Sequence, residues 1–202
     1  MITARSITAL EKDKLPEAAK AIASTELPLL VELLSERDDD IRYKAFLVLR
    51  HRSQLSDDVY PFWDTFKSKL KSQNSYQRSI GLMLIAENAR WDVENRLEDT
   101  MDDYLDLLND EKPITVRQYI QSLGKIAAQR PDLCGKTAGK LTCFDIMAVK
   151  ESMRKPVLLD ILLVLAQIRK THSSDEIESF FLSALSGEIL DKKAKKQVEQ
   201  LL

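Results

Sequence analysis

The sequence predicts an all-α chain of about five antiparallel helix pairs. Apolar residues recur at three- and four-residue spacing along most of the chain, for example over Val93–Leu108 and Val116–Ala127, as on the buried face of a helix. No window of four or more residues keeps a convincing alternation of apolar and polar side chains, so we expect no sheet. Only 5 Gly and 6 Pro occur in 202 residues, too few for a turn-dense all-β chain.

Prolines mark where most of these helices begin. Each proline stands at the front of an apolar-periodic run, where its missing N–H costs nothing because the first helical turn leaves that group unpaired. The six are Pro16, Pro28, Pro61, Pro113, Pro131 and Pro156. Ser173 and Glu176 form a candidate capping box before the last apolar run. We therefore expect about ten helices in one domain, 1–202, with capping helices over 1–26, repeats over 27–170 and a capping pair over 171–202.

An internal repeat sets the order of these helices. Segments beginning at Ile41, Gln77 and Val116 align, and their arginines Arg42, Arg78 and Arg117 are separated by 36 and 39 residues. A weaker fourth copy, interrupted by proline, places Arg154 another 37 residues on. A fixed period in this range indicates a solenoid, in which each helix pair hides its apolar face by stacking on its neighbours.

With this repeat the chain resembles HEAT-like, armadillo-type α-solenoids over roughly Leu27–Lys170. Their motif is an arginine near the start of the second helix, preceded about six positions earlier by an acid. Glu36 and Glu111 match the acid, whereas Ser72 and Ala148 do not. The resemblance implies a right-handed α-α superhelix with an incomplete hydrogen-bonded ladder between repeats. The repeat arginines Arg42, Arg78 and Arg117 are candidate phosphate ligands, but their position near helix starts and their period favour a structural role. The resemblance also implies a scaffold that binds proteins, peptides or nucleic acid along the concave row of second helices.

An acidic run is the most unusual local feature. Its members stand four residues apart and have one base among them, Arg96: Glu94, Glu98, Asp102, Asp106 and Asp110. Like charges at this spacing on a helix oppose each other by a few tenths of a kcal/mol per pair. We expect either a docking face for a basic partner or an ordinary solvated outer face.

Two further groups are candidate partner-binding surfaces. The junction between the second and third pairs gathers acid, base and aromatic side chains, Glu87, Arg90, Trp91 and Asp92. The alternative for it is structural, with Trp91 as a wedge between repeats and Asp92 as a helix cap. The second group consists of polar residues on the second helices, which would flank an apolar saddle at Ile80–Ile85 or simply face solvent: Lys44, Arg50, Gln118, Gln121 and Lys125.

No catalytic, metal or cofactor motif emerges from the sequence. The two cysteines, Cys134 and Cys143, have no ligand partners at short spacing and are expected to be reduced, as in the cytoplasm. Gly135-Lys136-Thr137 resembles the end of a phosphate-binding loop, but Arg130 stands where that loop needs glycine. We expect neither a secretory signal nor a membrane span.

Three functions follow from these observations, with the partner and the oligomeric state left open. The favoured one is a non-enzymatic module that binds a protein or peptide. The second is a DNA-binding protein resembling alkylpurine DNA glycosylases, with Trp91, Asp92 and either Arg117 or Arg130 as candidates. The net charge of −2 argues against it, although 15 Lys and Arg against 10 Asp and Glu after Glu111 could form a local basic patch. The third is a structural subunit of a homo-oligomer or larger complex.

Overall fold

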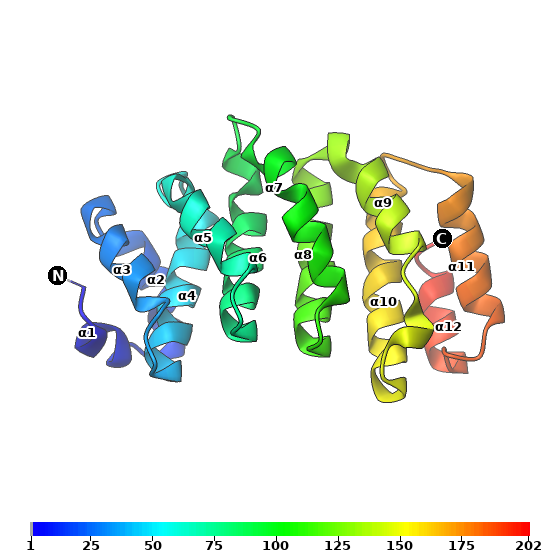
Figure 1. Cartoon of the computed structure of the whole chain (residues 1–202), viewed down its shortest axis with the longest axis horizontal. Helices are drawn as coiled ribbons and strands as arrows, with labels where there is room; N and C mark the ends of the chain where they lie inside the picture. The colour runs from blue at the N-terminus through cyan, green and yellow to red at the C-terminus, as the bar shows by residue number, and fades with distance from the viewer. Residues whose placement is uncertain (1) are drawn as a thin grey trace. The chain divides into compact units, whose positions relative to one another are not determined.

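Every regular element in residues 2–202, the part of the chain that the computed structural model describes, is helical (Figure 1). The prediction of an all-α chain is therefore confirmed. The α-helices are α1 (Ala4–Thr8), α2 (Leu15–Ala21), α3 (Leu27–Leu33), α4 (Asp39–Ser53), α5 (Trp63–Leu70), α6 (Ser75–Asn88), α7 (Arg96–Leu105), α8 (Pro113–Gln129), α9 (Cys134–Thr142), α10 (Glu151–Ile168), α11 (Asp175–Ser186) and α12 (Lys192–Glu199). Short 3₁₀ turns join several of them, including η5 (Asp106–Asn109) and η7 (Ile146–Ala148). The chain divides into two units, Met1–Met101 and Asp102–Leu202.

In the first unit, α4 is the central helix. The helices α1, α2 and α3 all pack on it, α6 lies beside it, and α5 pairs with α6 (Figure 1). Trp63 and Phe66 of α5 are fully buried in the core of this unit. The Trp63 indole N–H also donates to the Thr100 hydroxyl at 3.1 Å, so the largest core side chain leaves no polar atom unpaired.

Gly81 sets the distance between α5 and α6. A Cβ atom at this position would stand 2.6 Å from the Phe66 carbonyl oxygen and 2.9 Å from Lys69 Cβ. Only glycine allows the two helices to approach this closely. Because the two helices lie so close, the Cβ atom of Lys69 contacts α6 at Gly81.

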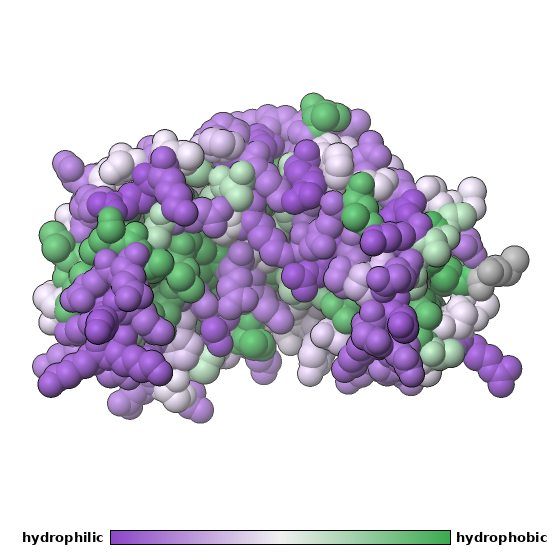
Figure 2. Space-filling view, turned by 180° about the vertical axis from the view of Figure 1, so that it is seen from behind, coloured by the Kyte–Doolittle hydropathy of each residue, from purple (hydrophilic) through white to green (hydrophobic). Residues whose placement is uncertain are grey.

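In the second unit, α8 and α10 pack along each other (Figure 1), and α9 and η7 lie against α10. An ion pair joins the two long helices: Arg117 Nε donates to Asp160 Oδ2 at 2.6 Å. This hydrogen bond raises the pKa of Arg117. On the face drawn in Figure 2 hydrophilic side chains predominate, and hydrophobic ones gather in separate patches. In the second unit, Ile120 and Leu123 of α8 and Ile161 and Leu165 of α10 are fully buried.

Pro156 does not start a helix, contrary to the sequence prediction. It lies inside α10, which begins five residues earlier at Glu151 and continues to Ile168. A proline in the second turn removes one backbone hydrogen bond near the helix start and leaves the later turns intact. The fourth repeat copy is therefore continuous.

The repeat arginines hold the connections within helix pairs. Arg42 Nη1 donates to the carbonyls of Glu36 and Arg37 at 2.8 and 3.4 Å. Arg78 Nη1 repeats the pattern on the carbonyls five and six residues before it, at 3.1 and 2.8 Å. Because the acceptors are backbone oxygens, serine at position 72 serves as well as glutamate at position 36. These hydrogen bonds lie within one helix pair, whereas the expected ladder runs between repeats.

The remaining two arginines follow the pattern only in part. In the fourth copy Arg154 donates to the carbonyls of Met147 and Val149 at 2.9 and 3.0 Å, although its sequence match is the weakest. In the third copy Arg117 instead pairs with Asp160 on α10. Three of the four copies therefore use the arginine to fix the connection that precedes it.

Candidate peptide-binding groove

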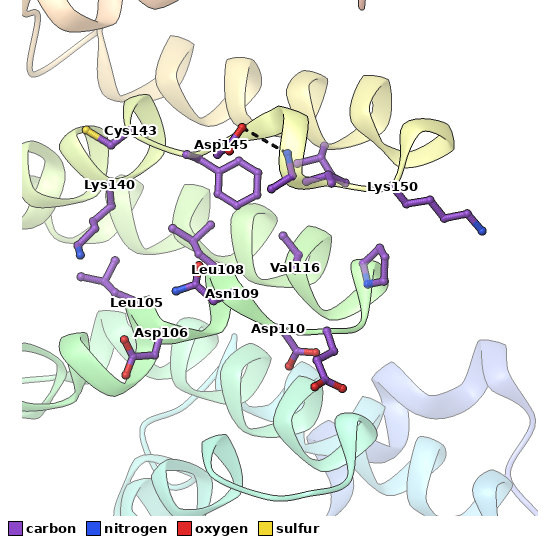
Figure 3. Close-up of a pocket in the computed structure, with 16 residues that line it drawn as sticks. Leu105, Asp106, Leu108, Asn109, Asp110, Val116, Lys140, Cys143, Asp145 and Lys150 are labelled. Carbon is purple, nitrogen blue, oxygen red and sulfur yellow. Dashed lines mark hydrogen bonds between the residues drawn. The ribbon is translucent and has the colours of Figure 1, made fainter.

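A groove of about 780 Å³ lies in the second unit, between two connections that lead into long helices (Figure 3). One wall is formed by η5 and the residues that follow it to Pro113, and the other by the end of α9 and the segment 143–150. The floor comes from α8 and α10. The groove is thus bordered by connections and first-helix elements, and not by the second helices, on which the sequence predicts the binding surface.

The floor of the groove is apolar. Leu105, Leu108 and Val116 point into the cavity in Figure 3, and all three are largely buried beneath its surface. Phe144 and Val149, both half-buried, add apolar surface from the opposite wall. Apolar surface that a ligand covers here contributes roughly 25 cal/mol per Å² to its binding.

The walls of the groove carry more acids than bases. The lining acids are Asp106, Asp110, Glu111 and Asp145, and the lining bases are Lys140 and Lys150. Figure 3 shows that Asp106 and Lys140 come from opposite walls and that Lys150 extends outward. An excess of acids along an apolar floor favours a ligand that carries both apolar and basic side chains.

Two of the four acids hold the walls in place. Asp145 Oδ1 accepts hydrogen bonds from the backbone N–H groups of Met147 and Ala148, at 2.9 and 3.3 Å, and so fixes η7. Asp110 Oδ1 accepts from the backbone N–H of Lys112 at 2.8 Å. Asp106, Glu111 and Asp145 are exposed, and because Asp145 already bonds the backbone of η7, Asp106 and Glu111 are best placed to meet a ligand.

The five acids at four-residue spacing do not form one helical stripe, which corrects that expectation. The helix α7 starts only at Arg96, after Glu94, and the α conformation ends at Leu105. Asp106 stands in the 3₁₀ turn η5, and Asp110 follows it. Glu94 forms an ion pair with Arg96, Glu98 accepts from the Asn95 side chain, and Asp102 pairs with Lys136. Only Asp106 and Asp110 line the groove.

The start of α7 has a specific cause. Asp92 Oδ1 and Oδ2 accept the backbone N–H groups of Arg96 and Leu97 at 2.8 and 2.9 Å, which satisfies two of the unpaired donors of the first turn. Asn95 adopts a left-handed φ of 58° just before the helix. The Tyr60 hydroxyl donates to the same carboxylate at 2.9 Å.

The junction residues make structural contacts within the first unit. The Trp91 indole N–H donates to the Ser53 carbonyl at 2.7 Å, and Arg90 donates to the Gln54 carbonyl at 3.2 Å. Glu87 is only 3% exposed and pairs with Arg50 at 2.9 Å. These contacts fasten the end of α6 to the end of α4. They correspond to the wedge and helix-cap alternative for Trp91 and Asp92.

Lys44 lies inside the fold, which corrects its placement on a binding surface. It is 8% exposed, and its Nζ donates to the Thr8 carbonyl at 2.7 Å and pairs with Asp40. In the second unit, Gln121 is exposed and donates to Asp160 at 3.1 Å, while Gln118 and Lys125 are half-buried. None of these polar residues of the second helices lines the groove.

The wall 143–150 was missed from the sequence. The available signal was a gap in the helical periodicity between α9 and α10, with apolar residues such as Phe144 and Val149 in the gap. One exposed free thiol, Cys143, also lies there, whereas Cys134 is buried. Across residues 2–202, no three His, Cys, Asp or Glu side chains gather closely enough to hold a metal ion. In the same range no helix combines the length and apolar character that crossing a bilayer requires.

Comparison with solved structures shows the fold. The chain is similar to a designed armadillo repeat protein, YIII(Dq)4CqI, with a TM-score of 0.57 and 13% identity, over 98% of this chain and 89% of that one. Two engineered proteins from the Northeast Structural Genomics Consortium match all of this chain and 96% and 97% of their own, with TM-scores of 0.52 and 0.53 and identities of 13% and 14%. The chain thus has an armadillo/HEAT-like helical repeat fold. Neither a protein-family model nor a curated protein sequence matches it.

Proposed function

We propose that the protein is a non-enzymatic cytoplasmic scaffold that binds a segment of a partner protein in the groove of its second unit. The observation that carries the proposal is an apolar floor bordered by an excess of acids. Repeat folds of this type present extended surfaces suited to binding other chains. The segment that fits has two or three apolar side chains flanked by Lys or Arg.

The two parts of the groove have different tasks in this proposal. Apolar side chains of the ligand cover the half-buried Phe144 and Val149, which lie beside the buried floor of the groove, and this burial provides most of the affinity. Asp106 and Glu111 face solvent at the rim, where charges mainly raise the association rate and select the sign of the partner. Binding should therefore weaken as salt rises, without disappearing.

A pair of synthetic peptides tests the proposal. One carries apolar residues flanked by lysines, and its match carries glutamates in place of the lysines. Titration followed by fluorescence anisotropy should show binding of the basic peptide and at least about tenfold weaker binding of the acidic one, a difference of about 1.4 kcal/mol. Equal binding of both peptides, or of neither, contradicts the proposal.

Charge-reversal variants then locate the site. The double variant D106K/E111K should weaken binding of the basic peptide about tenfold or more. The matched control is E188K/E199K, which changes the net charge equally at exposed positions of the same unit outside the groove. An equal loss in both variants would show that only net charge matters. A labelled DNA duplex serves as a further arm, and tight DNA binding that falls steeply between about 50 and 200 mM salt would favour the nucleic-acid alternative instead.

A further inference from the structure

A second cavity, of about 700 Å³, lies in the first unit, far from the groove in sequence. It is bordered by the connection between α3 and α4, the end of α5, and the start of α6. Its lining is polar throughout and consists of Ser35, Glu36, Arg37, Asp39, Arg42, Ser68, Lys69, Lys71, Ser72, Asn74, Tyr76 and Gln77. Such a lining suits a small charged group better than an apolar one.

A buried cation, Lys69, stands in the wall of this cavity. It is 9% exposed, and its Nζ donates to the Ser35 hydroxyl at 3.2 Å and to the Gln77 amide oxygen. Both acceptors are neutral, and no carboxylate in residues 2–202 forms an ion pair with it. Two acceptors leave one of the three ammonium protons without a partner, and a buried charge with no counter-charge is costly. Burial accordingly lowers the pKa of Lys69.

The surrounding fold keeps Lys69 in this position. Gly81 lets α5 approach α6 so closely that Lys69 Cβ lies against the α6 backbone. Gln77 is itself fixed, because its Nε2 donates to the Leu34 carbonyl at 2.7 Å. The ammonium is therefore held between the end of α3 and the start of α6.

The charged side chains that line the cavity are mostly basic. Arg37, Arg42 and Lys71 line it together with Lys69, against two acids, Glu36 and Asp39. Asp39 is paired with Arg42, which leaves Glu36 as the other acid of the lining. The first turn of α6, a 14-residue helix, also borders the cavity, and the positive end of a helix dipole favours an anion.

We propose that this cavity binds a single oxyanion group, phosphate or carboxylate, with Lys69 as its central ligand and Arg37 at the rim. The bound oxyanion would accept a hydrogen bond from the third N–H of the Lys69 ammonium. It would also supply the negative counter-charge that no side chain in the described part of the chain supplies. Because the ligand stabilises the charged form of Lys69, binding should be accompanied by proton uptake near the lowered pKa. The inference concerns the first unit and is independent of the peptide proposed for the groove.

Titration of the intact protein with sodium phosphate and, separately, with sodium acetate tests the inference. Backbone amide NMR should show saturable shifts confined to residues around Ser35–Asp39 and Asn74–Gln77. Tighter binding of phosphate than of acetate identifies a phosphate group as the natural ligand, whereas equal or tighter acetate binding identifies a carboxylate. Shifts that do not saturate, or that spread over the surface lysines, mean an adventitious ion only and overturn the proposal.

Two lysine variants separate a site from a general charge effect. K69M should lose at least about tenfold in anion affinity, whereas K67M should lose less than about twofold. Lys67 lies on the same helix, and its Nζ donates to the Asp99 carbonyl outside the cavity. Equal losses in the two variants would refute a specific role for Lys69.

A third variant keeps the test decisive if K69M is poorly folded. S35D places a carboxylate at an exposed position whose side chain already contacts the Lys69 ammonium. It should supply the missing counter-charge from within the chain, raise Tm in anion-free buffer, and abolish the phosphate-dependent rise in Tm that the wild type shows. A full phosphate response in S35D would contradict the proposal.

Discussion

Alanine substitution of three helical glycines should change the free energy of unfolding in three different ways, because their surroundings differ. In α6, G81A places a methyl group 2.6 Å from the Phe66 carbonyl oxygen, which would have to move by about 0.8 Å to reach an ordinary contact of 3.4 Å. The obstacle is backbone, so α5 must shift as a whole. Overpacking of this kind costs about 1–3 kcal/mol, and a rigid obstacle places it near the upper limit. The gain in helix propensity offsets about 1 kcal/mol, so we expect a net loss of about 2 kcal/mol.

The other two glycines are matched controls. In G124A the new methyl meets Val164 Cγ2 at 3.3 Å, a side-chain atom that can give way, so the change should be nearly neutral. Gly139 has nothing within 4 Å of the new Cβ position, so G139A should stabilise by about 0.5–1 kcal/mol.

Urea unfolding measures these effects. Both tryptophans, Trp63 and Trp91, lie in the first unit, so their fluorescence reports on G81A, whereas circular dichroism reports on all helices. If G81A were as stable as wild type, the close approach of α5 and α6 would not exist in solution. The account of why Lys69 is buried would then fail with it.

Three further outcomes follow from single contacts. D92A should lower the free energy of unfolding by about 1–2 kcal/mol, because the start of α7 loses the acceptor for two backbone N–H groups. Tryptophan fluorescence measures this loss, and an unchanged stability would contradict the capping role of Asp92. Burial and the hydrogen bond to Asp92 raise the pKa of Tyr60 to about 12, so its stabilising contribution is complete below about pH 10 and is lost as pH rises towards 12. Y60F should therefore flatten the fall in Tm over that window, and an identical alkaline profile would exclude the effect. A thiol reagent should modify Cys143 rapidly and Cys134 only upon unfolding, and two fast thiols in the folded protein would contradict the burial of Cys134.

The sequence was sufficient to predict the helices and the repeat, because both are written in local spacing. The apolar period of a helix and the recurrence of Arg42, Arg78 and Arg117 can be read without knowing what packs on what. The cap at Asp92 was also readable, since an acid before an apolar run serves as an acceptor for unpaired N–H groups. The fold of the chain is therefore largely a local property of its sequence.

What could not be predicted depends on contacts between distant residues or on irregular backbone. Lys44 looked like surface, yet its ammonium bonds the Thr8 carbonyl, 36 residues away, and no local pattern announces such a partner. The missed wall of the groove, 143–150, has no helical period to detect. The prediction that the acids share one helical face was wrong because α7 begins only at Arg96, after Glu94. The left-handed Asn95 and the bonds to Asp92 set this start. In each case the deciding contact involves backbone whose conformation the side-chain pattern does not report.

Both candidate sites lie where the connections of neighbouring helix pairs meet, and the repeat arginines hold those connections. Arg42 and Arg78 fix the connections beside the oxyanion cavity, and Arg154 bonds the carbonyls of Met147 and Val149 in the groove wall. A residue that looked purely structural in the sequence thus positions the surface on which binding is proposed. R154K should not keep the wall in place, because a lysine ammonium cannot present the fixed fork of donors with which arginine spans two carbonyls.

The prediction for Arg154 can be checked without knowing the partner. In both R154M and R154K, the amides of 146–149 should exchange with solvent faster than in wild type, and the basic peptide should bind about three- to tenfold more weakly, a loss of about 0.7–1.4 kcal/mol. R130M is the matched control, since Arg130 pairs with Asp132 outside the groove. Faster exchange with unchanged peptide affinity would show that the segment 143–150 does not contribute to peptide binding. Unchanged exchange would mean that Asp145 alone suffices to fix η7 through its two backbone hydrogen bonds.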